Sequence, residues 1–157
     1  MKVAIGQDSH RFDFDDKDKK LILGGVIFEN STPLSGNSDA DVVLHSITNA
    51  VSGITCKNIL GKVADDMCKS GITDSEEYLK EALKYLNEKI VHLSISIECK
   101  TPKISPKIEE MRKNIACLLE IEIEKVSVKA GTNEKIGELG KGDAVEATSI
   151  VLLVKGE

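Results

Sequence analysis

Hydrophobic and polar positions follow two different periods along this chain, and each period predicts one kind of element. A spacing of three and four residues, typical of helices, recurs in three segments, and alternation or short apolar runs, typical of strands, occur in five. The predicted helices are residues 39–54, 74–89 and 105–119, and the predicted strands are residues 3–6, 21–28, 91–99, 126–130 and 147–154. Residues 57–72 show no clear period, so we expect a loop or lid there.

This order of elements predicts an α/β protein of two layers (α+β), in which helices cover one face of a mixed β-sheet. The strand at residues 147–154 becomes continuously apolar toward its end, which is typical of burial on both faces. The second face of the sheet would then need a partner, and a homo-oligomer that packs sheet against sheet would supply it. We find no internal repeat or linker, so a single domain is expected to span residues 1–157.

Composition narrows the classes of function. The chain has 157 residues, of which 41% are hydrophobic, enough for a real core. A net charge of −5 and an aromatic content of 3% argue against a nucleic-acid surface. No apolar run approaches the roughly 20 residues of a membrane span, and no signal or transit segment is expected. The four cysteines lack C-x-x-C spacing and are expected to be reduced thiols of a cytoplasmic protein.

Two of the three histidines stand beside carboxylates near the start of the chain. Asp8 and His10 are two residues apart in an extended segment, so we expect their side chains to share a face. His45 lies on the polar face of the helix at residues 39–54, which Ser38 is expected to cap. Three such ligands with a fourth position open are typical of catalytic zinc. The alternative is a solvated histidine next to carboxylates that the helix dipole favours.

A glycine-rich segment at residues 131–143 is a second candidate site. Its glycines let backbone N–H groups approach an anion, Thr132 can donate a hydrogen bond, and Lys135 or Lys141 supplies positive charge. Glu134 beside a phosphate would need a cation between them, for which Mg²⁺ is usual. The alternative is a flexible turn, a common role of glycine-rich loops.

Four short motifs together resemble those of the 2-C-methyl-D-erythritol 2,4-cyclodiphosphate synthase family, the cyclising enzymes of the non-mevalonate isoprenoid pathway. They are the D-x-H triplet at residues 8–10, S-D-x-D-V-x-x-H at residues 38–45, Pro-Lys at residues 102–103 and T-x-E-K-x-G at residues 132–137. Their order and spacing extend over nearly the whole chain.

The resemblance implies a homotrimer with active sites between adjacent subunits. It also implies the conversion of 4-diphosphocytidyl-2-C-methyl-D-erythritol 2-phosphate to 2-C-methyl-D-erythritol 2,4-cyclodiphosphate plus CMP, by a phosphorus–oxygen lyase. The attacking phosphate oxygen is already anionic and CMP is the leaving group, so neither needs strong acid or base help. The barrier lies in charge repulsion and geometry, which metal ions and backbone donors can lower.

The same resemblance implies the roles of individual residues. The ligands of zinc would be Asp8, His10 and His45. The catalytic residues would be Asn37, Thr132 and Glu134, with Glu134 meeting Mg²⁺ or Mn²⁺ on the diphosphate. The residues that bind the substrate would be Asp8, His10, Asn37, Ser38, Gly61, Asp66, Pro102, Lys103, Thr132, Asn133, Glu134 and Lys141. Residues 99–105 would form the cytosine pocket, largely through backbone groups.

The chain departs from the family pattern at several places. Asn37 stands where a histidine is usual, the ribose-binding turn is altered within residues 57–61, and Lys141 replaces an arginine, which loses a bidentate fork. These departures leave two other hypotheses open. One is a zinc-dependent phosphohydrolase or cyclase acting on a related diphosphate. The other is a non-catalytic trimeric binding module, although such a module has no need for three converging metal ligands.

Overall fold

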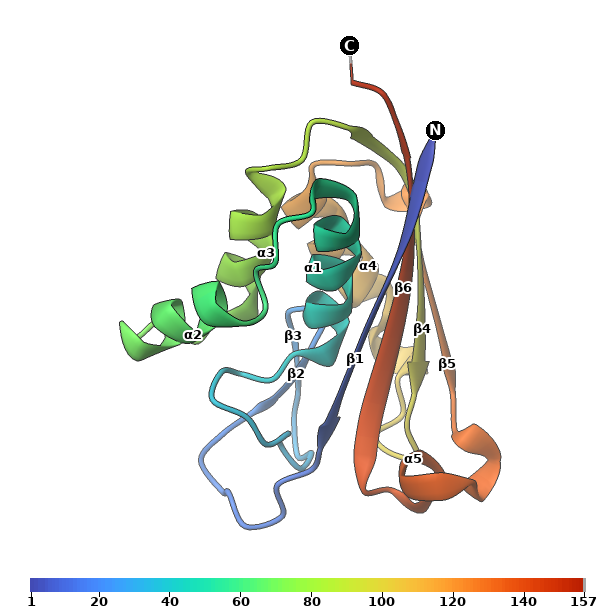
Figure 1. The fold of residues 1–157 in the computed structure, drawn as a ribbon. Helices are drawn as coiled ribbons and strands as arrows, with labels where there is room; N and C mark the ends of the chain where they lie inside the picture. Colours follow the sequence, from blue (N-terminus) through green and yellow to red (C-terminus); the bar gives the residue numbers. More distant parts are fainter. Residues whose placement is uncertain (157) are drawn as a thin grey trace.

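The computed structural model describes residues 1–156 and contains a four-stranded mixed sheet with helices on one face (Figure 1). In order across the sheet, the strands are β1 (Lys2–Arg11), β6 (Ala144–Val154), β4 (Lys89–Glu98) and β5 (Val126–Gly131). β4 and β5 run parallel, and the other neighbouring pairs are antiparallel. The predicted mixed sheet is therefore confirmed, and these strands lie at the predicted places.

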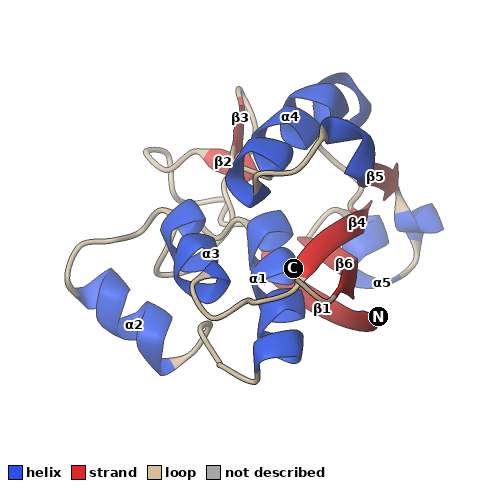
Figure 2. Cartoon of the chain, turned by 90° about the horizontal axis from the view of Figure 1, so that it is seen from above, coloured by secondary structure: helices blue, strands red, loops and turns tan. Residues whose placement is uncertain are grey.

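The main helices form the second layer. α1 (Val42–Thr55) lies against β1 and β6, α4 (Ile108–Leu119) lies against β5, and α3 (Ser75–Leu83) packs on α1. Seen from above, α1 is beside the sheet and α3 lies farther out (Figure 2). All three begin within a few residues of the predicted positions. No helix within residues 1–156 combines the length and the apolar character needed to cross a membrane.

The apolar segment at residues 21–28 folds into a separate two-stranded hairpin. Its strands are β2 (Leu21–Leu23) and β3 (Val26–Phe28), which pair antiparallel. Gly24 and Gly25 join them with φ angles of 63° and 75°, the left-handed conformation that a tight hairpin turn requires and glycine adopts without strain. The prediction of one strand over residues 21–28 is therefore wrong, because the two glycines turn the chain back so that its halves pair with each other.

Asp41 ties this turn to the beginning of α1. Its carboxylate accepts hydrogen bonds from the backbone N–H groups of Gly24 at 2.8 Å, Gly25 at 2.7 Å and Leu44 at 3.0 Å. Asp41 is therefore the N-cap of α1, and the prediction that Ser38 caps this helix is wrong. The reason is that Ser38 lies outside the helix, where its Oγ accepts the N–H of Ala40.

Gly6 lets α1 approach the sheet closely. A Cβ atom at this position of β1 would overlap the backbone carbonyl oxygen of Ser46 and the backbone nitrogen of Ala50. The backbones of β1 and α1 are therefore in direct contact, with no side chain between them. Residues Val42 to Thr48 of α1 are all buried. The alternative hypothesis of a solvated histidine on a polar helix face is wrong, because the sheet and α3 both pack against α1.

The stretch expected to be a loop or lid, residues 57–72, contains the helix α2 (Lys62–Lys69). The loop prediction is wrong for these residues because two helical turns are too short to show a period. Within α2 only Ala64 is buried, and Met67 packs against the small cluster that includes Ala64, Ile59 and Tyr78. Figure 2 shows α2 at the edge of the molecule, on the far side of α3 from the sheet.

Two further boundaries differ from prediction. α3 ends at Leu83 and not at residue 89, because β4 begins at Lys89 and pairs with β6 through its backbone. The glycine-rich segment contains the short helix α5 (Gly137–Lys141), whose five residues are too few to display a helical period.

The face of the sheet opposite α1 and α4 is uncovered and partly apolar. Ile5 of β1 and Ile150 of β6 lie opposite each other in the register and are 64% and 46% exposed, and Val3 is 66% exposed. Burial of residues 147–154 on both faces is therefore not seen within one chain.

Candidate metal centre and substrate cavity

Three metal-ligating side chains meet between β1 and α1. Asp8 and His10 point from β1 toward the helical layer, as their spacing of two predicted, and His45 points back from α1. Oδ2 of Asp8 lies 3.0 Å from Nδ1 of His45 and 3.2 Å from Nε2 of His10. One ligand atom from each residue lies within 4.8 Å of the other two, so the three could hold one metal ion.

The charges of this cluster favour a cation. Burial by itself raises the pKa of Asp8, but its hydrogen bonds to His10 and His45 outweigh burial and lower that pKa to about 2. The hydrogen bond to Asp8 in turn raises the pKa of His10. The carboxylate is thus ionised at neutral pH and faces two imidazole nitrogens. A proton or a metal ion must supply positive charge between them.

The far side of each imidazole is also hydrogen bonded. Nδ1 of His10 lies 2.7 Å from the carbonyl oxygen of Ser35, and Nε2 of His45 lies 2.8 Å from Oγ of Ser75. Histidines that bind metals usually donate their other N–H in this way, which fixes the ring orientation. Two imidazoles, one carboxylate and an open side suit zinc or a similar divalent ion.

The metal cluster opens into a cavity of about 440 Å³. The predicted site residues among those that line it are Asp8, His10, Asn37, Ser38, His45 and Gly61. Asp66 does not line it: this side chain is exposed on α2 and pairs with Lys62 at 2.6 Å. Its neighbour Asp65 lines the cavity instead.

Some residues at this cavity had no signal in the sequence. Cys68 and Tyr78 line it, and the Cys68 thiol donates to the carbonyl oxygen of Asn37 at 3.1 Å. Burial raises the pKa of Tyr78 to about 12, so its hydroxyl remains protonated and donates to the carbonyl oxygen of Ile72 at 2.6 Å. No local pattern marks these residues, because α2 and α3 bring them to the site through tertiary packing.

The second predicted group, from residues 131–143, lies elsewhere. Asn133, Glu134 and Lys135 have φ angles of 61°, 50° and 62°, a left-handed run that is uncommon for residues other than glycine. Thr132 Oγ1 accepts the N–H of Glu134 at 3.4 Å. None of these residues, nor Lys141, lines the cavity beside the metal cluster. A single chain therefore does not bring the two predicted groups together.

Pro102 lines a separate cavity of about 250 Å³, while Lys103 is exposed outside it. The residues around this cavity are Phe12, Phe14, Asn30, Ser31, Thr32, Thr101, Pro102 and Gly142. Gly142 follows α5, so this cavity adjoins the end of the glycine-rich segment.

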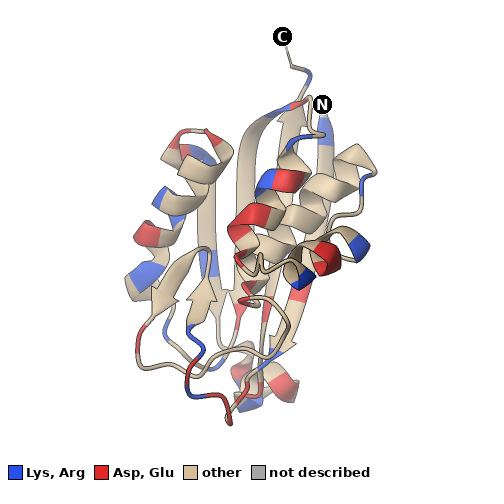
Figure 3. Ribbon diagram, turned by 90° about the vertical axis from the view of Figure 1, so that its left-hand side faces the viewer, with Lys and Arg blue, Asp and Glu red and all other residues tan. Residues whose placement is uncertain are grey.

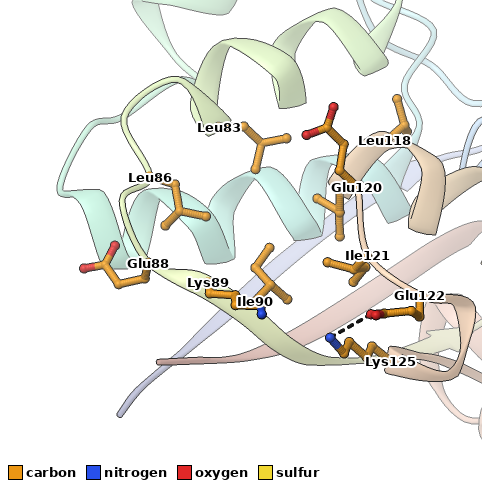
Figure 4. Close-up of a pocket in the computed structure, with 11 residues that line it drawn as sticks. Leu83, Leu86, Glu88, Lys89, Ile90, Leu118, Glu120, Ile121, Glu122 and Lys125 are labelled. Carbon is orange, nitrogen blue, oxygen red and sulfur yellow. Dashed lines mark ion pairs between the residues drawn. The ribbon is translucent and has the colours of Figure 1, made fainter. Parts of the chain in front are cut away.

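A larger cavity, of about 690 Å³, lies at the other end of β4 (Figure 4). Leucine and isoleucine side chains line its floor, and its charged residues include the ion pair of Lys125 with Glu122 at 2.7 Å. None of the polar residues around it is buried. Because no polar groups converge there, we assign the chemistry to the smaller cavity beside the metal cluster.

The helical side of the molecule carries mixed charge. Figure 3 shows acidic and basic residues interspersed over the helices seen from that side. This face therefore lacks the concentrated positive charge with which proteins bind nucleic acids.

Comparisons with known proteins agree on one relationship. A family model described as the YgbB family matches residues 1–154. Two curated relatives are named 2-C-methyl-D-erythritol 2,4-cyclodiphosphate synthase. The one from Chlamydia trachomatis serovar L2b is 44% identical, over 98% of this chain and 88% of its own length. The one from Chlamydia muridarum is 45% identical, with the same coverage.

Two solved structures are similar over 99% of this chain, each at 28% identity. IspF from Plasmodium falciparum, described as a CDP complex, has a TM-score of 0.83 over 97% of its own chain. The bifunctional IspDF from Campylobacter jejuni has a TM-score of 0.87, with the match covering 42% of that chain.

Proposed function

Because this chain belongs to the YgbB family, we propose that it is a cyclodiphosphate synthase, a phosphorus–oxygen lyase of isoprenoid biosynthesis. Its substrate would be 4-diphosphocytidyl-2-C-methyl-D-erythritol 2-phosphate, and its products 2-C-methyl-D-erythritol 2,4-cyclodiphosphate and CMP. The observation that carries the proposal is the convergence of Asp8, His10 and His45 at one end of a cavity. The CDP complex of the similar Plasmodium falciparum structure supports a cytidine diphosphate ligand.

Asp8, His10 and His45 would hold zinc. When bound, zinc would act as a Lewis acid that fixes and polarises a phosphate oxygen. Their contribution is two neutral nitrogens and one anionic oxygen, which leave net positive charge at the metal. Glu134 would meet Mg²⁺ or Mn²⁺ on the diphosphate, where a second cation offsets the charge that accumulates on the leaving group.

The substrate-binding roles that we propose are mainly those of hydrogen-bond donors. Ser38 Oγ accepts the N–H of Ala40 at 3.0 Å, so its own proton remains available to a phosphate oxygen. The hydroxyl proton of Thr132 is available in the same way, since its Oγ1 accepts the N–H of Glu134. The amide of Asn37 is exposed at the cavity and would replace the histidine usual in the family.

The remaining contacts that we propose fall into two sets. Gly61 and Asp66 would meet the ribose, which requires a movement of α2 because Asp66 now pairs with Lys62. Pro102, Lys103, Asn133 and Lys141 would bind the cytidine and the phosphates. The small cavity beside Pro102 supports a cytosine pocket within residues 99–105.

In this reaction an oxygen of the 2-phosphate attacks the phosphorus of the diphosphate that is attached to the erythritol. The new bond closes the ring, and the bond between that phosphorus and the bridging oxygen breaks, so that CMP leaves with the oxygen. The attacking oxygen carries no proton to be removed, which is consistent with a site of metal ligands and hydrogen-bond donors.

We further propose that the protein is a homotrimer with its active sites between subunits. Two observations support this: the uncovered apolar face around Ile5 and Ile150, and the separation of Thr132 and Glu134 from the metal cluster within one chain. A second copy that packs on the open face and extends past the edge strand β1 would supply the missing loop to the metal cluster on the helical side. The four cysteines are all free thiols, which supports a cytoplasmic location.

The test is CMP release from 4-diphosphocytidyl-2-C-methyl-D-erythritol 2-phosphate with zinc and Mg²⁺ present. We expect release by the wild-type protein, with the cyclic diphosphate detected by phosphorus NMR, and its loss in His45→Ala. Thr48→Ala is the matched control, because Thr48 is also a buried polar residue of α1 but does not line the cavity.

Failure of the folded, zinc-loaded wild-type protein to release CMP would reject the proposal. Activity on a different diphosphate would then favour the phosphohydrolase or cyclase alternative. The altered ribose-binding turn within residues 57–61 is the feature that keeps this alternative open.

A further inference from the structure

We propose that Ser75, held by Asp39, is a positioning residue that fixes which ring nitrogen of His45 is free to bind the metal. This inference rests on the proposed metal site. Ser75 does not line the cavity, so it acts through His45 and not on the substrate.

The contacts form a short chain between α3 and α1. Ser75 is the first residue of α3 and is fully buried. Its Oγ lies 2.8 Å from Nε2 of His45. On its other side, both its hydroxyl and its backbone N–H, the latter at 3.0 Å, donate to the carboxylate of Asp39. Asp39 also accepts the backbone N–H of Asp41 at 3.1 Å.

The count of protons determines the direction of each hydrogen bond. The carboxylate of Asp39 can only accept, and it lies at the N-terminus of α3, where negative charge is favourable. The single hydroxyl proton of Ser75 is therefore used on Asp39. The oxygen of Ser75 can then only accept from His45, so Nε2 of His45 must carry a proton.

This arrangement leaves Nδ1 of His45 as the nitrogen with a free lone pair. Nδ1 is the atom that lies 3.0 Å from Oδ2 of Asp8, at the position where the ligands converge. His10 is oriented by the opposite nitrogen, since its Nδ1 contacts the carbonyl oxygen of Ser35 at 2.7 Å and its Nε2 faces Asp8. Ser75 and Ser35 therefore have equivalent tasks, although they come from different elements.

The protonation state of His45 can be measured without any variant. In the zinc-loaded wild-type protein, nitrogen-15 NMR of the histidine rings should find the proton of His45 on Nε2 and its Nδ1 bound to the metal. A proton on Nδ1 would contradict the inference, whether or not the protein is a synthase.

Two variants test the same relationship through zinc affinity, measured by competition with a chelator. Ser75→Ala removes the acceptor of the Nε2 proton, and we expect zinc binding to weaken by about 10- to 100-fold. Asp39→Ala frees the Ser75 proton to donate to Nε2, which would move the His45 proton to Nδ1 and also weaken binding.

Ser46→Ala is the matched control. Ser46 is a buried serine of α1 whose hydroxyl contacts Val43 and Ser149 but not the histidines. We expect its zinc affinity to stay near that of the wild type. Equal affinities for Ser75→Ala and Ser46→Ala would overturn the role of Ser75, whereas a wild-type protein that binds no zinc would overturn the metal site itself.

Discussion

Nδ1 of His10 lies 2.7 Å from the carbonyl oxygen of Ser35. Because a carbonyl oxygen can only accept, this contact holds the proton of neutral His10 on Nδ1 and leaves Nε2 free to bind a metal. We therefore expect His10→Ala to lose most of the zinc that the wild-type protein binds, as measured by elemental analysis after dialysis. His92→Ala is the control, since His92 is an exposed histidine of β4 outside the cluster. Full zinc content in His10→Ala would remove His10 from the ligand set.

Asp41 should contribute more to stability than an ordinary helix cap. Asp41→Ala leaves three backbone N–H groups without their acceptor, those of Gly24, Gly25 and Leu44. We expect Asp41→Ala to lower the free energy of unfolding by more than about 3 kcal/mol, because each of the three unpaired N–H groups costs about 1 kcal/mol or more. Asp74→Ala, at the exposed cap of α3, should cost about 1 kcal/mol. Denaturant titration of both variants measures the difference, and equal losses would contradict the special role of Asp41.

The stability of the metal-free protein should depend on pH through Asp8. Its pKa is lowered to about 2 in the folded state, so its contribution is present above the unfolded value of 3.8 and is lost as the pH falls toward 2. The pKa of His10 is raised, so its contribution is present below 6.5 and is lost as the pH rises through the folded value. The two windows overlap near pH 5.

We therefore expect the free energy of unfolding of the wild-type protein to exceed that of Asp8→Asn by up to about 2 kcal/mol near pH 5, with chelator present. The difference should shrink both below pH 4 and above the pKa of His10. Denaturant titrations across this range measure it, and a difference independent of pH would show that the two groups are not coupled in this way.

The open face of the sheet should determine the oligomeric state. Ile5 is 64% exposed opposite Ile150, so Ile5→Lys places a charge in the centre of the proposed interface. Light scattering should give about three times the chain mass of 17.0 kDa for the wild type and a lower mass for this variant. Ile27→Lys is the control, because Ile27 is 43% exposed on the separate hairpin. A monomeric wild-type protein would reject the shared active site.

The features that the sequence predicted well depend on local spacing. Asp8 and His10 share a face because side chains of a strand alternate, and this holds wherever the strand lies in the fold. The mixed sheet and the starts of the main helices follow from patterns of the same kind.

The features that failed depend on contacts between distant segments. Helical spacing placed His45 on a polar face and left a solvated side chain open as an alternative, but it could not predict that Ser75 and the rest of α3 bury His45. The end of α3 at Leu83 is set by the pairing of β4 with β6. The helical spacing of apolar residues in the sequence does not reveal this pairing. Asp65 lines the cavity in place of the predicted Asp66 because of the orientation of α2, a two-turn helix too short to show a hydrophobic period in the sequence.

The contact of β1 with α1 at Gly6 limits which substitutions this protein can accept during evolution. Asp8 and His45 stand on two elements whose separation is set by backbone against backbone, so it does not depend on the size of the core side chains. We expect exchanges among aliphatic residues elsewhere to displace the two ligands less than a change at this contact would. A single methyl group added at Gly6 would instead push the helix from the strand and open the metal centre. Gly6 has no side chain to take part in the chemistry, yet it is among the positions least free to vary.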